Sequence, residues 1–360
     1  MQRYPLVDLL RALAALLVLV YHVIEVGRWQ DFPTVGLWRG FRMGGAGVNM
    51  FLVISGFVIG LVAIRAVADS RGAPWRRDFA ERRLRRIAPL YLLTCLVFVL
   101  LVDPTILLHG WAYAVQAIGS HLLFVHNLFL STSGSINPPN WSIGLEMQFY
   151  LLVMISAPWL ARASIPAVLV AWVGGALSWR FATTLALPPG HSNPFVQMHA
   201  SIQLPGMLDA FGMGIVLAKL AIAGRLGPSW KQAAAWATLG LALVELAWLI
   251  YWPHAGYWPS AIMIVGWPTL LAAGFAALLA ALVACPASGG WLTLPLRYLG
   301  QISYGIYLWH LPVLLTLVRA TPWRGAQLLA PVLLGTIVLA AFSWHAFEKR
   351  WLVPSQAKAR

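Results

Sequence analysis

Two ionisable residues with complementary chemistry lie in the first hydrophobic segment of the chain, residues 6–26. Arg11 and His22 are eleven positions apart, so an α-helix turning about 100° per residue brings them to within about 20° of one face. A rise of about 1.5 Å per residue separates them by about 16 Å, roughly half the hydrocarbon thickness of a bilayer. A charge at such depth costs about 2.5–3.5 kcal/mol and usually faces a cavity or a partner. An arginine reaching the headgroups and a histidine bound by a neighbouring helix would explain each residue alone, but not their shared face.

The second basic feature is a loop expected at residues 75–91, just before a hydrophobic run. It carries four closely spaced arginines, and a guanidinium group can bind phosphate through two parallel hydrogen bonds. A nucleotide-like molecule arriving from the cytoplasm would meet this patch first. A topology anchor that contacts anionic lipid is the alternative role, and it is compatible with the first. The arginines are Arg82, Arg83, Arg85 and Arg86.

Three further segments place polar groups among apolar ones: residues 44–60, 138–152 and 298–313. The glycines of the first segment allow close helix packing, or they could line a passage for an extended ligand. Glu146 lies one turn into the second run, as a candidate partner for His22 or Arg11 or as one member of a structural ion pair. Polar and aromatic residues in these segments are candidate substrate-binding groups, namely Asn49, Ser55, Trp141, Tyr150, Tyr307 and His310. His310 alone fits a structural role better than a catalytic one.

The composition determines which elements must position these groups. Of 360 residues, 60% are hydrophobic and only 10% are charged, and the mean hydropathy is +0.75. Soluble globular domains carry about 25% charged residues, so the composition predicts a polytopic membrane protein. The net charge of +14 follows from loop arginines and indicates no nucleic-acid partner. Cys95 and Cys285 are far apart and have neither the spacing of metal ligands nor that of a disulfide framework, so we expect no metal site.

The apolar runs predict an all-α integral membrane protein with about ten transmembrane helices around a polar central cavity. We expect one domain over residues 1–352, followed by a short basic cytoplasmic tail at 353–360. The run 111–130 is interrupted by histidines and an asparagine, so we expect a re-entrant or interfacial helix there. The expected spans are residues 6–26, 45–65, 87–103, 142–160, 164–186, 204–222, 233–251, 261–284, 298–319 and 327–347.

The distribution of basic residues orients this bundle. With the N-terminus inside, 18 of the 25 Lys and Arg residues fall in cytoplasmic segments and six fall outside. This excess agrees with the positive-inside rule, and an even number of spans returns the C-terminus to the cytoplasm. Both termini are therefore expected to be cytoplasmic.

The order and content of these segments resemble the membrane acyltransferase 3 family, of the carbohydrate O-acyltransferase type. Arg11 and His22 match its signature of Arg, ten residues and His, and RRLRRIAPLYLL resembles the basic start of its third helix. NWSIGLEMQFYLL keeps Glu146, while Met147 replaces a second acid, and GVNMF has Asn49 where Asp is common. The resemblance extends to about residue 352 through MFLVISGFVIG, LGQISYGIYLWHLPV and SWHAFEKRWL.

The resemblance implies transfer of an acyl group, acetyl in the commonest case, from cytoplasmic acyl-CoA to a hydroxyl of an extracytoplasmic sugar or glycolipid. It places the chain in the bacterial cytoplasmic membrane, with acyl-CoA as co-substrate and no permanently bound cofactor. His22 would act as general base or as an acyl relay, because a neutral imidazole accepts a hydroxyl proton at neutral pH. Glu146 and Asp8 complete the candidate catalytic residues. The CoA phosphates would be held by Arg11, Arg82, Arg85 and Arg86.

A transporter or flippase without covalent chemistry is the alternative function, since intramembrane Arg, His and Glu also relay charge in carriers. Inverted repeats with paired broken helices would favour transport. The two halves of the sequence show no such pairing.

Overall fold

A computed structural model gives the structure of the protein and describes residues 4–69, 75–188, 190, 193–254, 260–287 and 290–352. Within these ranges the chain forms α-helices joined by short 3₁₀ and π segments, without a β-strand. The helices are α1 (Val7–Val26), α2 (Gly47–Asp69), α3 (Trp75–Val97), α4 (Trp111–Leu122), α5 (Trp141–Arg162), α6 (Ile165–Leu169), α7 (Gly175–Ala186), α8 (Pro194–Ser201), α9 (Leu208–Ile222), α10 (Trp230–Tyr251), α11 (Ala261–Val265), α12 (Trp267–Ala284), α13 (Leu294–Gln301), α14 (Ser303–Ala320), α15 (Ala326–Ser343) and α16 (Lys349–Leu352).

The described helices confirm an all-α integral membrane protein. Nine helical segments in the described ranges are long and apolar enough to cross a membrane, and the broken pair α13–α14 is a tenth candidate. The break falls at Ile302, inside the expected span 298–319. Helix α4 has 12 residues, too few to span the hydrocarbon core. The cytoplasmic position of both termini and the central cavity stay predictions, and the expected tail at 353–360 lies outside the described residues.

The prediction of a basic loop at residues 75–91 is wrong. Helix α3 begins at Trp75, twelve positions before the apolar run from which the expected span 87–103 was drawn. The segment RRDFAERRLRR contains only two residues of lower helix propensity, Asp78 and Phe79, and has neither Gly nor Pro. An ion pair at i, i+4 between Glu81 and Arg85, at 2.6 Å, further supports the helix. A hydropathy criterion finds only the apolar part of such a helix.

The chain divides into two compact units, and α1 and α5 each contribute to both. The first unit comprises Met1–Ala14, Ala46–Ala73 and Gln148–Gly300. The second comprises Ala15–Gly45, Pro74–Met147 and Gln301–Arg360.

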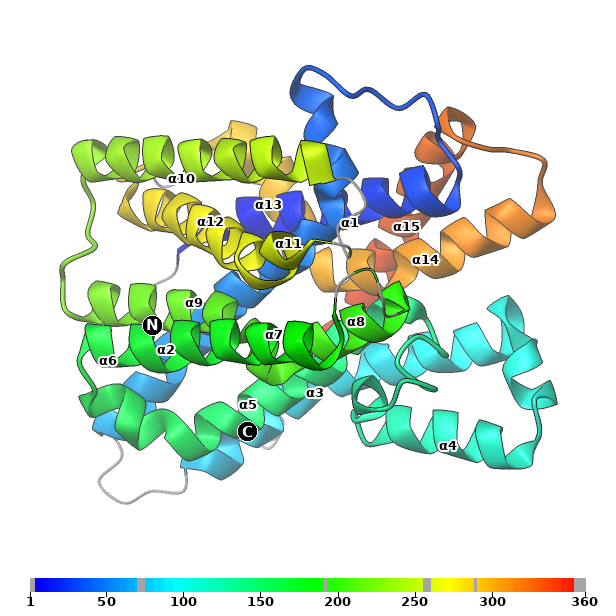
Figure 1. Cartoon of the computed structure of the whole chain (residues 1–360), viewed down its shortest axis with the longest axis horizontal. Helices are drawn as coiled ribbons and strands as arrows, with labels where there is room; N and C mark the ends of the chain where they lie inside the picture. The colour runs from blue at the N-terminus through cyan, green and yellow to red at the C-terminus, as the bar shows by residue number, and fades with distance from the viewer. Residues whose placement is uncertain are drawn as a thin grey trace. The chain divides into compact units, whose positions relative to one another are not determined.

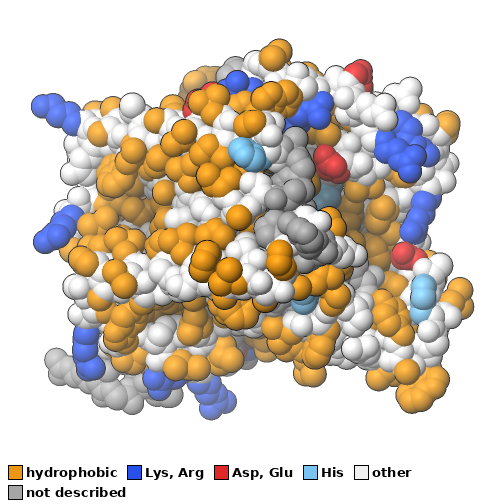
Figure 2. Space-filling model, viewed as in Figure 1, with side chains coloured by type: hydrophobic (Ala, Val, Ile, Leu, Met, Phe, Trp, Pro, Cys, Tyr) orange, Lys and Arg blue, Asp and Glu red, His pale blue; other side chains and the backbone are white. Residues whose placement is uncertain are grey.

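The first unit is built on two closely packed helix pairs, α2 with α9 and α10 with α12 (Figure 1). Gly56 of α2 faces α9 so closely that an added Cβ would lie 2.1 Å from the carbonyl oxygen of Phe211. Gly214 of α9 returns the contact, since its Cβ would lie 2.1 Å from the oxygen of Val53. Small residues permit this backbone approach in membrane bundles. Figure 2 shows hydrophobic side chains spread around α7, α10 and α12, with Lys and Arg side chains along the edges of this face.

The second unit is organised around α14, which packs against α15 and α3 (Figure 1). Polar side chains join its start to other segments. Tyr304 donates its hydroxyl to the carbonyl oxygen of Ile87 on α3 at 2.8 Å. Asn137 donates Nδ2 to the oxygen of Leu308 at 3.0 Å. These bonds fix the direction in which α14 presents its remaining polar residues.

Candidate functional site

His22 lies on α1, in the second unit, and its ring is anchored to its own helix. Nδ1 is 2.9 Å from the carbonyl oxygen of Val18, one turn earlier. A carbonyl oxygen can only accept, so Nδ1 carries the proton and donates it. The neutral imidazole then has its lone pair on Nε2, and the side chain is partly exposed. The ring is therefore arranged to accept a proton at Nε2.

The structure places a second histidine against His22. Nε2 of His310, on α14, is 3.2 Å from Nδ1 of His22, and the two ring centroids are 4.9 Å apart. Tyr21 packs edge-on against the His22 ring, with centroids 5.4 Å apart. His310 itself is buried at 1% exposure. The hydrogen bonds of His22 therefore run to Val18 and His310 among the described residues, and a role for Glu146 in orienting His22 stays a prediction.

Tyr307 is one turn before His310 and belongs to the same unit. Its hydroxyl donates to the carbonyl oxygen of Pro139 at 2.9 Å and lies 2.8 Å from the hydroxyl of Ser142. The Glu146 carboxylate is within electrostatic range of this hydroxyl. Trp141, at the start of α5, is half-buried. The segment 138–146 and α14 therefore meet, and Tyr307 is buried and already hydrogen-bonded.

Two histidines that the sequence showed only as interruptions form a buried stack beside α3. The His121 and His126 rings lie 3.9 Å apart at an interplanar angle of 13°. Nδ1 of His121 donates to the oxygen of Ala117, and Nε2 of His126 donates to the oxygen of Asn140 at 2.9 Å. Burial lowers the pKa of His121 to about 4, and burial with the neighbouring imidazole lowers that of His126 to about 3. Both rings are thus neutral near pH 7, and they support the fold.

The arginines of α3 are not equivalent. Arg82 is exposed, and Arg85 is partly neutralised by Glu81. Arg86 lies over the Trp344 ring, with its guanidinium carbon 5.4 Å from the centroid. Arg86 therefore contributes to packing within the second unit, while Arg82 is exposed to a solution anion.

The remaining predicted residues belong to the first unit. Arg11 donates a hydrogen bond from Nη1 to the Asp8 carboxylate at 2.9 Å. Asp8, a candidate catalytic residue, is therefore the ion-pair partner of Arg11, a candidate phosphate ligand. Both side chains are partly exposed, at 32% and 21%. Asn49 and Ser55 of α2 are half-buried and Tyr150 is buried. Because these residues fall in the other unit, a substrate site that joins them to His22 stays a prediction.

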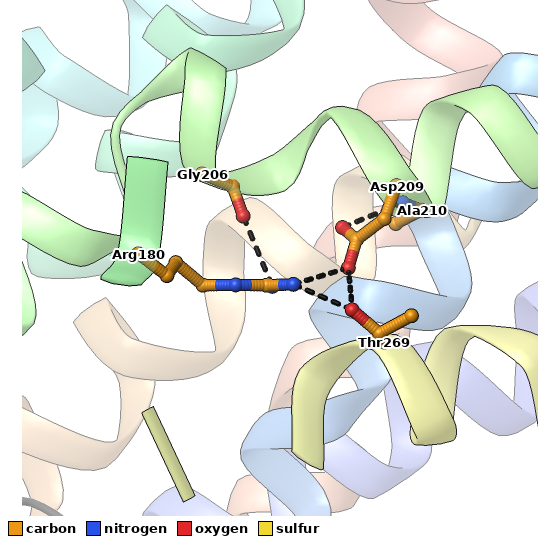
Figure 3. A network of polar contacts seen from close by, with 5 residues as sticks. All are labelled: Arg180, Gly206, Asp209, Ala210 and Thr269. Carbon is orange, nitrogen blue, oxygen red and sulfur yellow. Dashed lines mark hydrogen bonds and ion pairs between the residues drawn. The ribbon is translucent and has the colours of Figure 1, made fainter. Parts of the chain in front are cut away.

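The sequence reasoning missed a buried ion pair in the first unit. Arg180 of α7 points its guanidinium at Asp209 of α9 (Figure 3), and Nη2 is 2.6 Å from Oδ2. Both side chains are only 1% exposed. Thr269 of α12 donates its hydroxyl to the same oxygen at 2.6 Å, and the carbonyl oxygen of Gly206 accepts from Nη1 at 3.1 Å. The charge distribution counts Arg180 among the six basic residues on the outer side, although it lies within the expected span 164–186. An arginine and an aspartate each inside an apolar run were the available signal.

Within the described ranges, no group of three or more His, Cys, Asp or Glu is arranged to hold a metal ion. Cys95 is a buried free thiol that accepts a hydrogen bond from Asn140 at 3.3 Å, and Cys285 is also free.

The comparisons with known proteins match the part of the chain that contains the motifs described above. A family model described as an acyltransferase domain, of the acyltransferase 3 type, matches residues 4–348. The YrhL protein of Bacillus subtilis, provisionally named a peptidoglycan O-acetyltransferase, is 30% identical over 96% of this chain and 54% of its own length. The peptidoglycan O-acetyltransferase OatA of Listeria monocytogenes is 26% identical over 96% of this chain and 55% of its own. BcsY of Komagataeibacter xylinus, provisionally named a membrane-bound transacylase, is 27% identical over 96% and 82%.

The chain thus spans about half the length of the first two of these relatives. No solved structure matches it. The family match begins at residue 4, extends into the last candidate span, Ala326–Leu352, and includes His22, Glu146 and His310. The chain therefore belongs to the acyltransferase 3 family and carries its acyltransferase domain across the membrane-spanning bundle.

Proposed function

We propose that the protein transfers an acyl group, acetyl by the names of its relatives, from acyl-CoA to a hydroxyl of an extracytoplasmic sugar polymer or glycolipid. The observation that carries the proposal is His22. Its Nδ1 proton is held by the Val18 carbonyl oxygen at 2.9 Å, which leaves the lone pair on Nε2 of a partly exposed ring. A neutral imidazole with a defined basic nitrogen is what general-base catalysis requires near pH 7.

The proposed step uses His22 twice. Nε2 takes the proton as the sugar hydroxyl attacks the thioester carbonyl carbon, and a carbon–oxygen bond forms while the carbon–sulfur bond breaks. The imidazolium then returns the proton to the leaving thiolate, so the enzyme ends unchanged. In the alternative chemistry, Nε2 attacks the thioester itself and an acyl-histidine passes the group to the hydroxyl. Both routes need the same lone pair.

The donor is proposed to bind at the basic start of α3, in the same unit as His22. CoA carries several phosphate charges, and Arg82 is an exposed guanidinium beside Arg85. Peptidoglycan is the acceptor named for two of the relatives, and we propose a glycan of that kind here. Because the relatives come from bacteria, we propose the bacterial cytoplasmic membrane as the location.

The test uses purified protein in liposomes with radiolabelled acetyl-CoA and a cell-wall glycan extract. His22→Ala should lower transfer by about 100-fold or more, the usual contribution of a general base, while the protein elutes as a folded species. His254→Ala is a matched control, because Nδ1 of His254 contacts the Ile250 oxygen at 2.8 Å in the same helical manner. It should retain full transfer. Acetylation by His22→Ala at the wild-type rate would refute the proposed role.

A further inference from the structure

The contact between His22 and His310 carries an inference that rests on the proposed function. We propose that His310 is a positioning residue that accepts a hydrogen bond from Nδ1–H of His22 and, together with the Val18 oxygen, holds the tautomer in which Nε2 of His22 is the basic atom. Both residues lie in the second unit, so their contact lies within one compact body.

The protonation of the pair follows from its carbonyl neighbours. Nδ1 of His310 is 2.6 Å from the oxygen of Tyr307, and that oxygen can only accept. Nδ1 of His310 therefore carries a proton, and its Nε2 has the lone pair. That lone pair faces Nδ1 of His22 at 3.2 Å, which carries a proton because of Val18. The proton of His22 is thus shared between two acceptors, a backbone oxygen and an imidazole nitrogen.

Burial argues against direct contact between His310 and a substrate. The side chain is 1% exposed, and both of its nitrogens are already engaged. His22 by contrast is partly exposed. The residue available to the sugar is therefore His22, and His310 acts through it, which replaces the expectation that His310 binds substrate.

The charge that develops during transfer explains why an acceptor is needed. When Nε2 of His22 takes the hydroxyl proton, the ring becomes a cation and its Nδ1–H becomes a stronger donor. The Nε2 lone pair of His310 stabilises that cation without breaking any bond, and the added proton leaves from Nε2 of His22 to the thiolate. A neutral imidazole also avoids the cost of burying an acidic partner in a membrane-spanning helix.

The ring is held from other directions as well. Tyr21 contacts it edge-on at a centroid distance of 5.4 Å, and the His310 ring is tilted by 49° against it. Fixing the ring plane matters because proton transfer to Nε2 requires the lone pair to point at the hydroxyl.

The experiment compares His310→Gln with His310→Phe and His310→Leu. Glutamine Oε1 reaches about as far as histidine Nε2 and can accept the bond, whereas Phe and Leu cannot. Losing a hydrogen bond to a charged group should lower kcat by about 10- to 100-fold in Phe and Leu, with KM for donor and acceptor unchanged. Glutamine should restore most of kcat. Leu314→Ala, one turn further along α14 and fully buried, controls for lost stability alone.

A second readout needs no acyl donor. Diethyl pyrocarbonate modifies unprotonated imidazole nitrogens, and peptide mass spectrometry gives the rate at His22. His109 is the internal reference, since it is exposed and its Nδ1 contacts the Thr105 oxygen at 2.7 Å in the same helical manner. Modification of His22 relative to His109 should fall in the Phe and Leu variants and recover in Gln.

The outcomes separate the two proposals. Folded Phe and Leu variants with wild-type kcat, or a Gln variant as impaired as both, would overturn the role of His310 while acyl transfer stands. If labelling of His22 depends on His310 as stated but no variant, wild type included, acylates a glycan, the histidine pair stands and the proposed function fails.

Discussion

Removing one member of the buried ion pair Arg180–Asp209 should destabilise the first unit far more than removing a partly exposed pair does. In Arg180→Met the Asp209 carboxylate, 1% exposed, keeps Thr269 and loses its counter-charge. Breaking a buried pair in this way costs about 3–5 kcal/mol. At about 2–4 °C per kcal/mol for a body of this size, Tm should fall by roughly 6–20 °C. The double variant Arg180→Met, Asp209→Leu leaves no bare charge and should recover most of that loss.

The matched comparison is Asp8→Asn, also in the first unit. Arg11 and Asp8 are 32% and 21% exposed, so their pair should contribute only about 0–1 kcal/mol. Loss of the folded peak with temperature, followed by fluorescence-detected size-exclusion chromatography in detergent, measures all four proteins. The expected ranking is refuted if Arg180→Met is as stable as wild type, or if the double variant is no more stable than Arg180→Met.

Three further predictions test other parts of the molecule. First, the folded pKa values of His121 and His126, about 4 and 3, lie below the unfolded value near 6.5, so the unfolded chain binds more protons and stability falls as the pH falls below 6.5. Because the slope approaches about 1.36 kcal/mol per unit and per histidine only below pH 6.5, the loss from pH 6.5 to pH 5 is about 3 kcal/mol for the two residues. Tm in the variant His121→Phe, His126→Gln should show a shallower pH dependence than wild type. Second, Gly56→Ala should cost about 1–3 kcal/mol, because its Cβ would lie 2.1 Å from the Phe211 oxygen, whereas Gly174→Ala, with nothing within 4 Å, should leave Tm unchanged. Third, Arg82→Gln should raise KM for acyl-CoA and weaken the salt dependence of that KM without lowering Tm. Arg86→Gln should lower Tm, because the contact between the guanidinium and the Trp344 ring is lost. Equal Tm values for the two variants would contradict this.

The helical architecture could be predicted because apolar runs of about 20 residues have few other uses. The first span was expected at residues 6–26 and is observed as Val7–Val26. The third span shows the limit of the method, since its helix begins at Trp75, in a segment rich in arginine. Hydropathy reports where a helix enters hydrocarbon, whereas helix propensity and i, i+4 pairs decide where it begins.

The candidate site could be predicted only residue by residue. His22 was identifiable because a histidine deep in a span is costly, and Glu146 was one candidate partner for it or for Arg11. The structure places His310 against it, which is 288 positions away in the chain and was not foreseen as a partner. Single-sequence periodicity contains no information about such a pairing, because each helix face is defined relative to its own axis only. The pair Arg180–Asp209 escaped prediction for the same reason.

Exposure and hydrogen bonding distinguish the intramembrane polar groups that could take part in catalysis from those that only stabilise the fold. Arg180 and Asp209 are 1% exposed and meet each other, Thr269 and the Gly206 oxygen, so no substrate can reach them in this arrangement. Among the described residues, the hydrogen bonds of His22 both involve Nδ1, and the side chain is partly exposed. A histidine inside an apolar span costs free energy, and in a chain of the acyltransferase 3 family this cost is consistent with the proposed role of Nε2 as the acceptor of a hydroxyl proton.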